Sequence, residues 1–232
     1  MDSSDVANGL VWYGVFVFSA VLHEAAHAWT SFRLGDATAR EQITLDPTPH
    51  IRREPVGMIV VPLIIFMISK GSYTLGWASA PYNALWAQRF PKRAAIMALA
   101  GPLSNLAVVL ITMLIIRVSV TMGVFTPPET VTSFADVTVA PGGGLAANVA
   151  FLLSILFALN LLLFVFNLLP VPPLDGSAIL PLFLSERMAR SYLGFIRSPM
   201  FAILGIVVAW QIFHDFFGPV FVLALRVLYL GV

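Results

Sequence analysis

The sequence contains no cysteine, so neither disulfide bonds nor thiolate metal ligands are available to it. Any metal ion would have to be held by histidine and carboxylate side chains. Charge is also scarce, because 11% of the 232 residues are Asp, Glu, Lys or Arg, against roughly 25% in an ordinary soluble domain. The net charge is +1, and the basic residues are spread over loops with few aromatic residues between them. This distribution gives no case for nucleic acid as a partner.

Hydrophobic residues make up 59% of the chain and gather in long runs. A span of about 20 apolar residues crosses a hydrocarbon core about 30 Å thick. The runs of that length cover residues 10–32, 94–120, 145–169 and 200–230. We therefore expect an all-α polytopic membrane protein with about four transmembrane helices, forming one membrane-embedded domain over residues 1–232, with no separate soluble domain and no internal repeat.

Lys and Arg collect in cytoplasmic loops of membrane proteins. The N-terminal residues Met-Asp-Ser-Ser-Asp carry no base, whereas Arg33, Arg40, Arg52 and Arg53 follow the first run. We therefore expect a retained first helix rather than a signal peptide, with its N-terminus outside the cell. This orientation places all but two of the 13 Lys and Arg residues, Arg117 and Arg226, on the cytoplasmic side of the plasma or inner membrane.

Several shorter segments are expected between the spans. Residues 36–55 are polar and proline-containing, so they predict a loop or short strands rather than a helix. Residues 56–69 are apolar but short for a crossing and contain Pro62, which favours a re-entrant or extended element. Residues 179–197 predict an amphipathic cytoplasmic segment. The last run is interrupted at 214–215 and 218–219, where we expect one crossing to end and a terminal helix to follow.

The first run contains the pattern His-Glu-Ala-Ala-His at residues 23–27. On a helix His23 and His27 lie about 6 Å apart along the axis and on one face, where they could share a metal ion. Glu24 takes the place of the general base in zinc hydrolases with this pattern. The alternative is a chance occurrence of solvated or hydrogen-bonded side chains. The hydrophobic surroundings favour a functional role over chance. A carboxylate at membrane depth costs about 2.5–3.5 kcal/mol, so ionisable residues there usually have a function or a partner.

A catalytic zinc usually has three protein ligands and an open position. Asp46 and His50 lie in a polar loop, and His214 lies near the opposite end of the last crossing. Asp175 is the best candidate, because apolar and proline residues flank it and an unpaired carboxylate there would be costly. The alternative role for Asp175 is that of an N-cap for the helix after Gly176.

Three motifs together carry a family resemblance: HEAAH at 23–27, AGPLSN at 100–105 and NLLPVPPLDG at 167–176. In order and spacing they resemble the site-2 protease family of intramembrane zinc metalloproteases. The resemblance implies a three-helix catalytic core with one catalytic Zn²⁺ and an extended element, at 58–63 or 76–81, that pairs with substrate. It implies these roles for individual residues: metal ligands His23, His27 and Asp175; general base Glu24; substrate or oxyanion contact Asn167; structural motif residues Gly101, Asn105, Pro170 and Gly176.

The function expected from these features is hydrolysis of peptide bonds within or near transmembrane segments of protein substrates in the lipid bilayer. One alternative is a metal or proton transporter that uses the same ionisable residues as a pathway. Transporters often carry inverted repeats and ionisable groups through the full membrane depth, and the sequence shows neither. A second alternative is a catalytically inactive protein that binds transmembrane partners.

Overall fold

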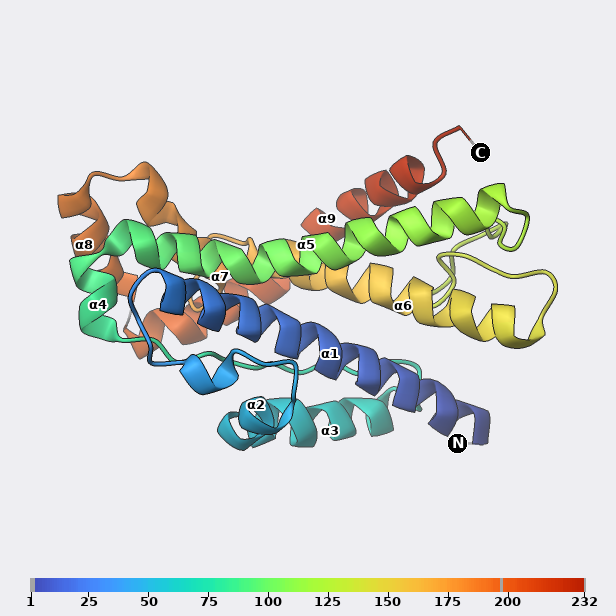
Figure 1. Cartoon of the computed structure of the whole chain (residues 1–232), viewed down its shortest axis with the longest axis horizontal. Helices are drawn as coiled ribbons and strands as arrows, with labels where there is room; N and C mark the ends of the chain where they lie inside the picture. Colours follow the sequence, from blue (N-terminus) through green and yellow to red (C-terminus); the bar gives the residue numbers. More distant parts are fainter. Residues whose placement is uncertain (1–2, 197, 232) are drawn as a thin grey trace.

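The computed structural model describes residues 3–196 and 198–231. Figure 1 shows a bundle of long helices with shorter elements beside it and at one end. Helix α5 packs against both α1 and α6, and α9 packs mainly against α6. The long helices have these bounds: α1 Ser3–Arg33, α5 Pro91–Thr121, α6 Gly144–Asn167 and α9 Pro199–Leu228. Within the described residues the chain is helical and forms no strand, which confirms the all-α prediction.

The three helices α1, α5 and α6 are long and apolar enough to cross a membrane. A fourth span is present within the described part of the chain if α8 and the first part of α9, bent by 86° at their junction, count as one. Helices suit this setting because all their backbone hydrogen bonds lie within the segment, where lipid offers no partners. The chain is an integral membrane protein.

The polar segment after α1 is partly helical, so the prediction of a loop or strands was wrong for part of it. A 3-10 turn covers Arg40–Gln42, and helix α2 covers Thr48–Arg53. The prolines suggested a break, but Pro49 lies in the first turn of α2. A proline is tolerated there because the N–H it lacks would have no partner within the helix.

The apolar segment at 56–69 is helical, so the expected extended conformation at 58–63 was wrong. A π-helical turn, η2 (Val56–Val60), continues into α3 (Val61–Ile68), and Pro62 lies in the first turn of α3. Helix α3 runs beside the N-terminal half of α1, where Phe66 lies against Gly9 and Gly71 against the Asp5 carbonyl.

Residues 73–83 form no helix or strand and return along η2 and α3. Trp77 N–H donates to the Gly57 carbonyl, and Asn83 N–H reaches the Asp36 carboxylate beyond the C-terminus of α1. The segment 56–83 therefore runs toward the N-terminus of α1 and back. As a result, Lys70 lies at the N-terminal end of α1, contrary to its predicted place among the cytoplasmic loops.

The remaining elements gather at the opposite end of the bundle from the N-terminus (Figure 1). They are α4 (Ala84–Arg89), α7 (Asp175–Ile179), a 3-10 turn (Leu180–Phe183) and α8 (Glu186–Ile196). Helix α8 is amphipathic, with Ala189 buried and Arg190 exposed. Helix α9 runs unbroken through Pro219, so the predicted interruption of the last run was wrong.

Candidate metal centre

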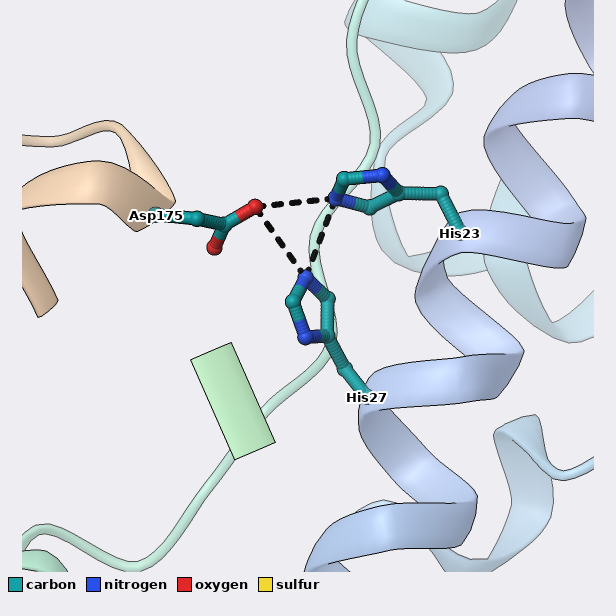
Figure 2. A group of neighbouring side chains, drawn as sticks. All are labelled: His23, His27 and Asp175. Atoms are coloured by element: carbon teal, nitrogen blue, oxygen red, sulfur yellow. Dashed lines mark hydrogen bonds and ion pairs between the residues drawn. The ribbon is translucent and has the colours of Figure 1, made fainter. Parts of the chain in front are cut away.

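The two histidines of the HEAAH motif face the same side of α1 (Figure 2). Both are buried, and their rings meet edge to face with centroids 4.6 Å apart. The two Nε2 atoms are 3.0 Å apart. The four-residue spacing places them together because a helix turns through about one full revolution in 3.6 residues.

Asp175 brings a carboxylate to the same point from α7. Its Oδ2 atom lies 3.0 Å from His23 Nε2 and 3.3 Å from His27 Nε2. Asp175 is the first residue of α7, and Leu174 occupies the N-cap position, so the alternative N-cap role for Asp175 was wrong. These three residues form the sole cluster of at least three potential metal ligands found among the described residues.

The residue after Asp175 allows α7 to approach the end of α6 closely. A Cβ atom at Gly176 would lie 2.3 Å from the Leu168 carbonyl oxygen and 2.4 Å from that of Leu169. Backbone oxygens cannot rotate away as a side chain could. Gly176 therefore permits the packing that carries Asp175 to the histidines.

A hydrogen bond at Nδ1 of each histidine determines whether Nε2, which points toward Asp175, carries a proton. His27 Nδ1–H donates to the Met97 backbone carbonyl at 2.7 Å, and His23 Nδ1–H donates to Asn105 Oδ1 at 2.6 Å. With Nδ1 protonated, Nε2 of a neutral imidazole carries a lone pair. The two Nε2 lone pairs then face the Asp175 carboxylate, and one cation between them could bind all three groups. Two histidines and one aspartate are a fitting donor set for zinc.

Gly101 on α5 lies directly opposite the Nε2 atoms of the two histidines. A Cβ atom built on Gly101 would lie 2.3 Å from His27 Nε2 and 2.5 Å from His23 Nε2. The family resemblance implied only a structural role for this glycine. The structure adds that the missing side chain leaves open the position that the two Nε2 atoms face.

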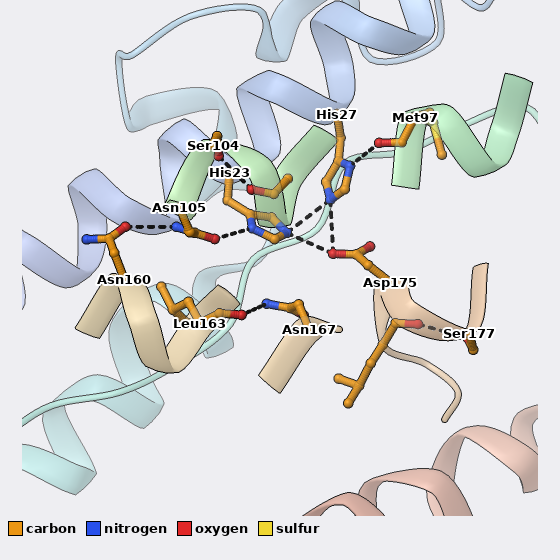
Figure 3. Close-up of polar contacts among 12 residues, drawn as sticks. His23, His27, Met97, Ser104, Asn105, Asn160, Leu163, Asn167, Asp175 and Ser177 are labelled. Carbon is orange, nitrogen blue, oxygen red and sulfur yellow. Dashed lines mark hydrogen bonds and ion pairs between the residues drawn. The ribbon is translucent and has the colours of Figure 1, made fainter. Parts of the chain in front are cut away.

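The other two predicted site residues lie on the same helices. Glu24 follows His23 on α1 and is buried, at 7% exposed. Asn167 ends α6, and its Nδ2 donates to the Leu163 carbonyl at 3.0 Å (Figure 3). Both roles, together with those of the three metal ligands, remain proposals.

Two of the three alternative ligands weighed from the sequence, Asp46 and His50, lie apart from this cluster. Asp46 is exposed and accepts hydrogen bonds from the backbone and hydroxyl of Thr48. His50 is buried in α2, with Nε2 3.4 Å from the Thr44 carbonyl. The side chain of His214 is outside the described residues.

Two partners of the histidines were missed. The Met97 carbonyl carries no sequence signal, because any residue has one. Asn105 was predicted to have a structural role, and its contact with His23 was not predicted. A polar residue inside an apolar run usually faces the bundle interior, and this rule could have drawn attention to Asn105 and also to Asn160.

Comparisons with known proteins place the chain in a family. The profile of peptidase family M50 matches residues 12–207. YwhC of Bacillus subtilis, named as a candidate zinc metalloprotease, is 32% identical over 167 residues, which cover 71% of this chain and 64% of YwhC. Rip2 of Mycobacterium tuberculosis, named likewise, is 31% identical over 228 residues, which cover 94% of this chain and 77% of Rip2.

The chain therefore spans somewhat less than two thirds of the length of YwhC. A third relative, Rip2 of Mycolicibacterium smegmatis, is 26% identical over 201 residues, which cover 82% of this chain and 66% of that protein. No solved structure matches the chain. The family profile covers most of the chain, and the motifs predicted the same relationship: the chain belongs to peptidase family M50, the site-2 protease family.

Proposed function

We propose that this protein is a zinc metalloprotease that hydrolyses peptide bonds within or near the transmembrane segments of membrane proteins. The observation that carries the proposal is the convergence of His23, His27 and Asp175 between helices long and apolar enough to span a membrane. These three residues would hold one zinc ion. When bound, zinc polarises the scissile carbonyl and makes water a better nucleophile.

The residues around the cluster would supply the remaining chemistry. Glu24 takes a proton from the attacking water and passes it to the leaving nitrogen. Glu24 is suited to this role because it is buried on the same helix as both histidines and directly follows His23. Asn167 would turn its amide from the Leu163 carbonyl toward the substrate and steady the backbone or the developing oxyanion.

A transmembrane substrate must unwind before cleavage, because a helix ties up its carbonyl oxygens in internal hydrogen bonds. Within the irregular segment 73–83, residues 76–81 have a non-helical backbone and lie beside α3. We propose that this backbone pairs with the unwound part of the substrate. We also propose that the N-terminus lies outside the cell and the metal centre toward the cytoplasm, where the polar residues 36–55 admit water.

The decisive experiment compares wild-type protein with the variant Glu24→Gln. Both would be incubated in detergent with a panel of single-span membrane proteins, and cuts would be located by mass spectrometry. We expect the variant to retain zinc and to lose at least about 100-fold in cleavage rate, the scale of general acid–base catalysis. Glu41→Gln, which makes the same change at an exposed residue, is the matched control.

Full cleavage by a zinc-loaded Glu24→Gln variant would exclude Glu24 as the base. If the wild-type protein cuts no substrate but carries zinc or protons into liposomes, the proposed protease function is wrong and the transporter function is correct.

A further inference from the structure

A chain of buried polar side chains connects α6 to His23 through α5 (Figure 3). Asn105 Nδ2 donates to Asn160 Oδ1 at 2.9 Å, and Asn160 Nδ2 donates to Ser19 Oγ at 2.9 Å and to the Leu156 carbonyl at 2.8 Å. Asn105, Asn160 and Ser19 are all 0% exposed. Buried amides in an apolar bundle are costly unless paired, and here each one is paired.

The direction of this chain follows from one atom that can only accept. The Leu156 backbone carbonyl has no proton, so the amide of Asn160 must turn its NH₂ group toward it. Asn160 Oδ1 then faces Asn105 and requires an N–H from it. Asn105 must therefore present Oδ1 to His23, and the proton between them must reside on His23 Nδ1.

We propose that Asn160 is a positioning residue that, through Asn105, keeps the proton of His23 on Nδ1 and leaves Nε2 free to bind the metal. The inference rests on the proposed zinc site. His27 needs no such relay, because a backbone carbonyl, which cannot reverse its polarity, holds its Nδ1 proton.

The relay matters because the amide of Asn105 could otherwise rotate. Rotated by 180°, it would offer NH₂ to His23 and favour the tautomer with its proton on Nε2. That proton would point at Asp175 Oδ2, which lies 3.0 Å away, and would have to leave before a metal could bind. Mutation of a side chain that hydrogen-bonds to a metal ligand typically weakens metal binding by about 10- to 100-fold.

The test measures the zinc dissociation constant in detergent by competition with a chelator. We expect Asn160→Leu, which is close to the asparagine in size, to weaken zinc binding about tenfold. Asn105→Asp presents a carboxylate oxygen to His23 in either orientation, so in that background Asn160→Leu should cost no further affinity. If Asn160→Leu fails to fold, Asn160→Ala removes the same amide without added bulk and should show the same dependence on background.

The matched control is Ser154→Ala, which removes another buried hydrogen-bonding side chain from α6, one that contacts Thr138 and not the histidines. We expect its zinc affinity to equal that of the wild type. Loss of affinity in Ser154→Ala as large as in Asn160→Leu would overturn the inference, and so would an equal loss from Asn160→Leu in both backgrounds.

A second measurement detects the proton on His23 Nδ1 by NMR. In protein labelled with ¹⁵N at histidine, the Nδ1–H signal of His23 should be strongly shifted and protected from exchange with water, and Asn160→Leu should abolish that protection. If the wild type binds no zinc but this signal still depends on Asn160, the zinc site is wrong and the relay stands. If the wild type binds zinc and neither reading changes in Asn160→Leu, the relay is wrong and the zinc site stands.

Discussion

Gly101 shows how much one missing side chain can decide at the scale of a residue. Its Cα faces the two Nε2 atoms so closely that a methyl group would fill the position open to a metal. We predict that Gly101→Ala weakens zinc binding by about 100-fold or more, the upper end of the range for changes near a metal site. The dissociation constant measured with a competing chelator checks this.

The control for that variant is Gly14→Ala in α1, where a Cβ atom would meet nothing within 4 Å. Alanine is favoured over glycine in a helix by about 0.5–1 kcal/mol, so this variant should bind zinc normally and be slightly more stable. Zinc binding by Gly101→Ala at the wild-type affinity would show that the metal sits elsewhere.

His50 is a second residue with a property that its neighbours set. Burial lowers the pKa of its imidazole from 6.5, and the Thr44 carbonyl and the charges of Glu24 and Asp46 oppose that shift without reversing it. Its Nδ1 atom has no hydrogen-bond partner among the described residues. His50 therefore binds a proton more readily when α2 is unfolded than when it is folded, and the stability of α2 is lost as the pH falls below about 6.5.

We predict that the amides of α2 exchange with deuterium faster at pH 5.5 than at pH 7.5, after correction for the intrinsic exchange rates. The amides of α6 should show no such change, and His50→Gln should abolish the pH dependence in α2. Equal protection of α2 at both pH values in the wild type would show that His50 does not control this helix.

At the scale of elements, α9 supports the loop that leads into Asp175. A Cβ atom at Gly205 would lie 1.7 Å from the Pro172 carbonyl oxygen, so α9 and the backbone before α7 are in close contact. We predict that Gly205→Ala displaces this loop and Asp175 with it, and so weakens zinc binding about tenfold. It should also lower the free energy of unfolding by about 1–3 kcal/mol, as overpacking does.

Gly218→Ala is the matched control on the same helix, because a Cβ atom there meets nothing within 4 Å. Zinc titration and thermal unfolding of the two variants in parallel give the comparison. If they behave alike, contact between α9 and the loop does not position Asp175.

The sequence predicted three of the four long helices correctly, and its predictions were less accurate for α9 and for the short elements. The apolar runs predicted α1, α5 and α6 because length and hydrophobicity suffice to recognise a span. Prolines misled the prediction at Pro49, Pro62 and Pro219, where breaks were expected. Two of these lie in the first turn of a helix and the third inside a long helix, and only the surroundings of a proline decide which outcome occurs.

At the scale of the whole molecule, the absence of cysteine makes the orientation easy to test. Thr130 lies in the segment between α5 and α6 and Glu41 in the segment between α1 and α3, and both are exposed. We predict that a membrane-impermeant maleimide labels Thr130→Cys in intact cells and labels Glu41→Cys only after permeabilisation. The reverse pattern would place the metal centre on the outer side of the membrane.

The sequence alone determined that the chain is helical, lies in a membrane and presents His23 and His27 on one face, because helical periodicity and hydrophobicity act between near neighbours. Only the tertiary structure decided that Asp175, 152 residues from His23, meets these histidines, and that Asn105 and Gly101 face them. These contacts depend on how α1, α5 and α7 pack together. Packing is fixed by the fit of many side chains at once, and that fit is not written in the spacing of any one motif.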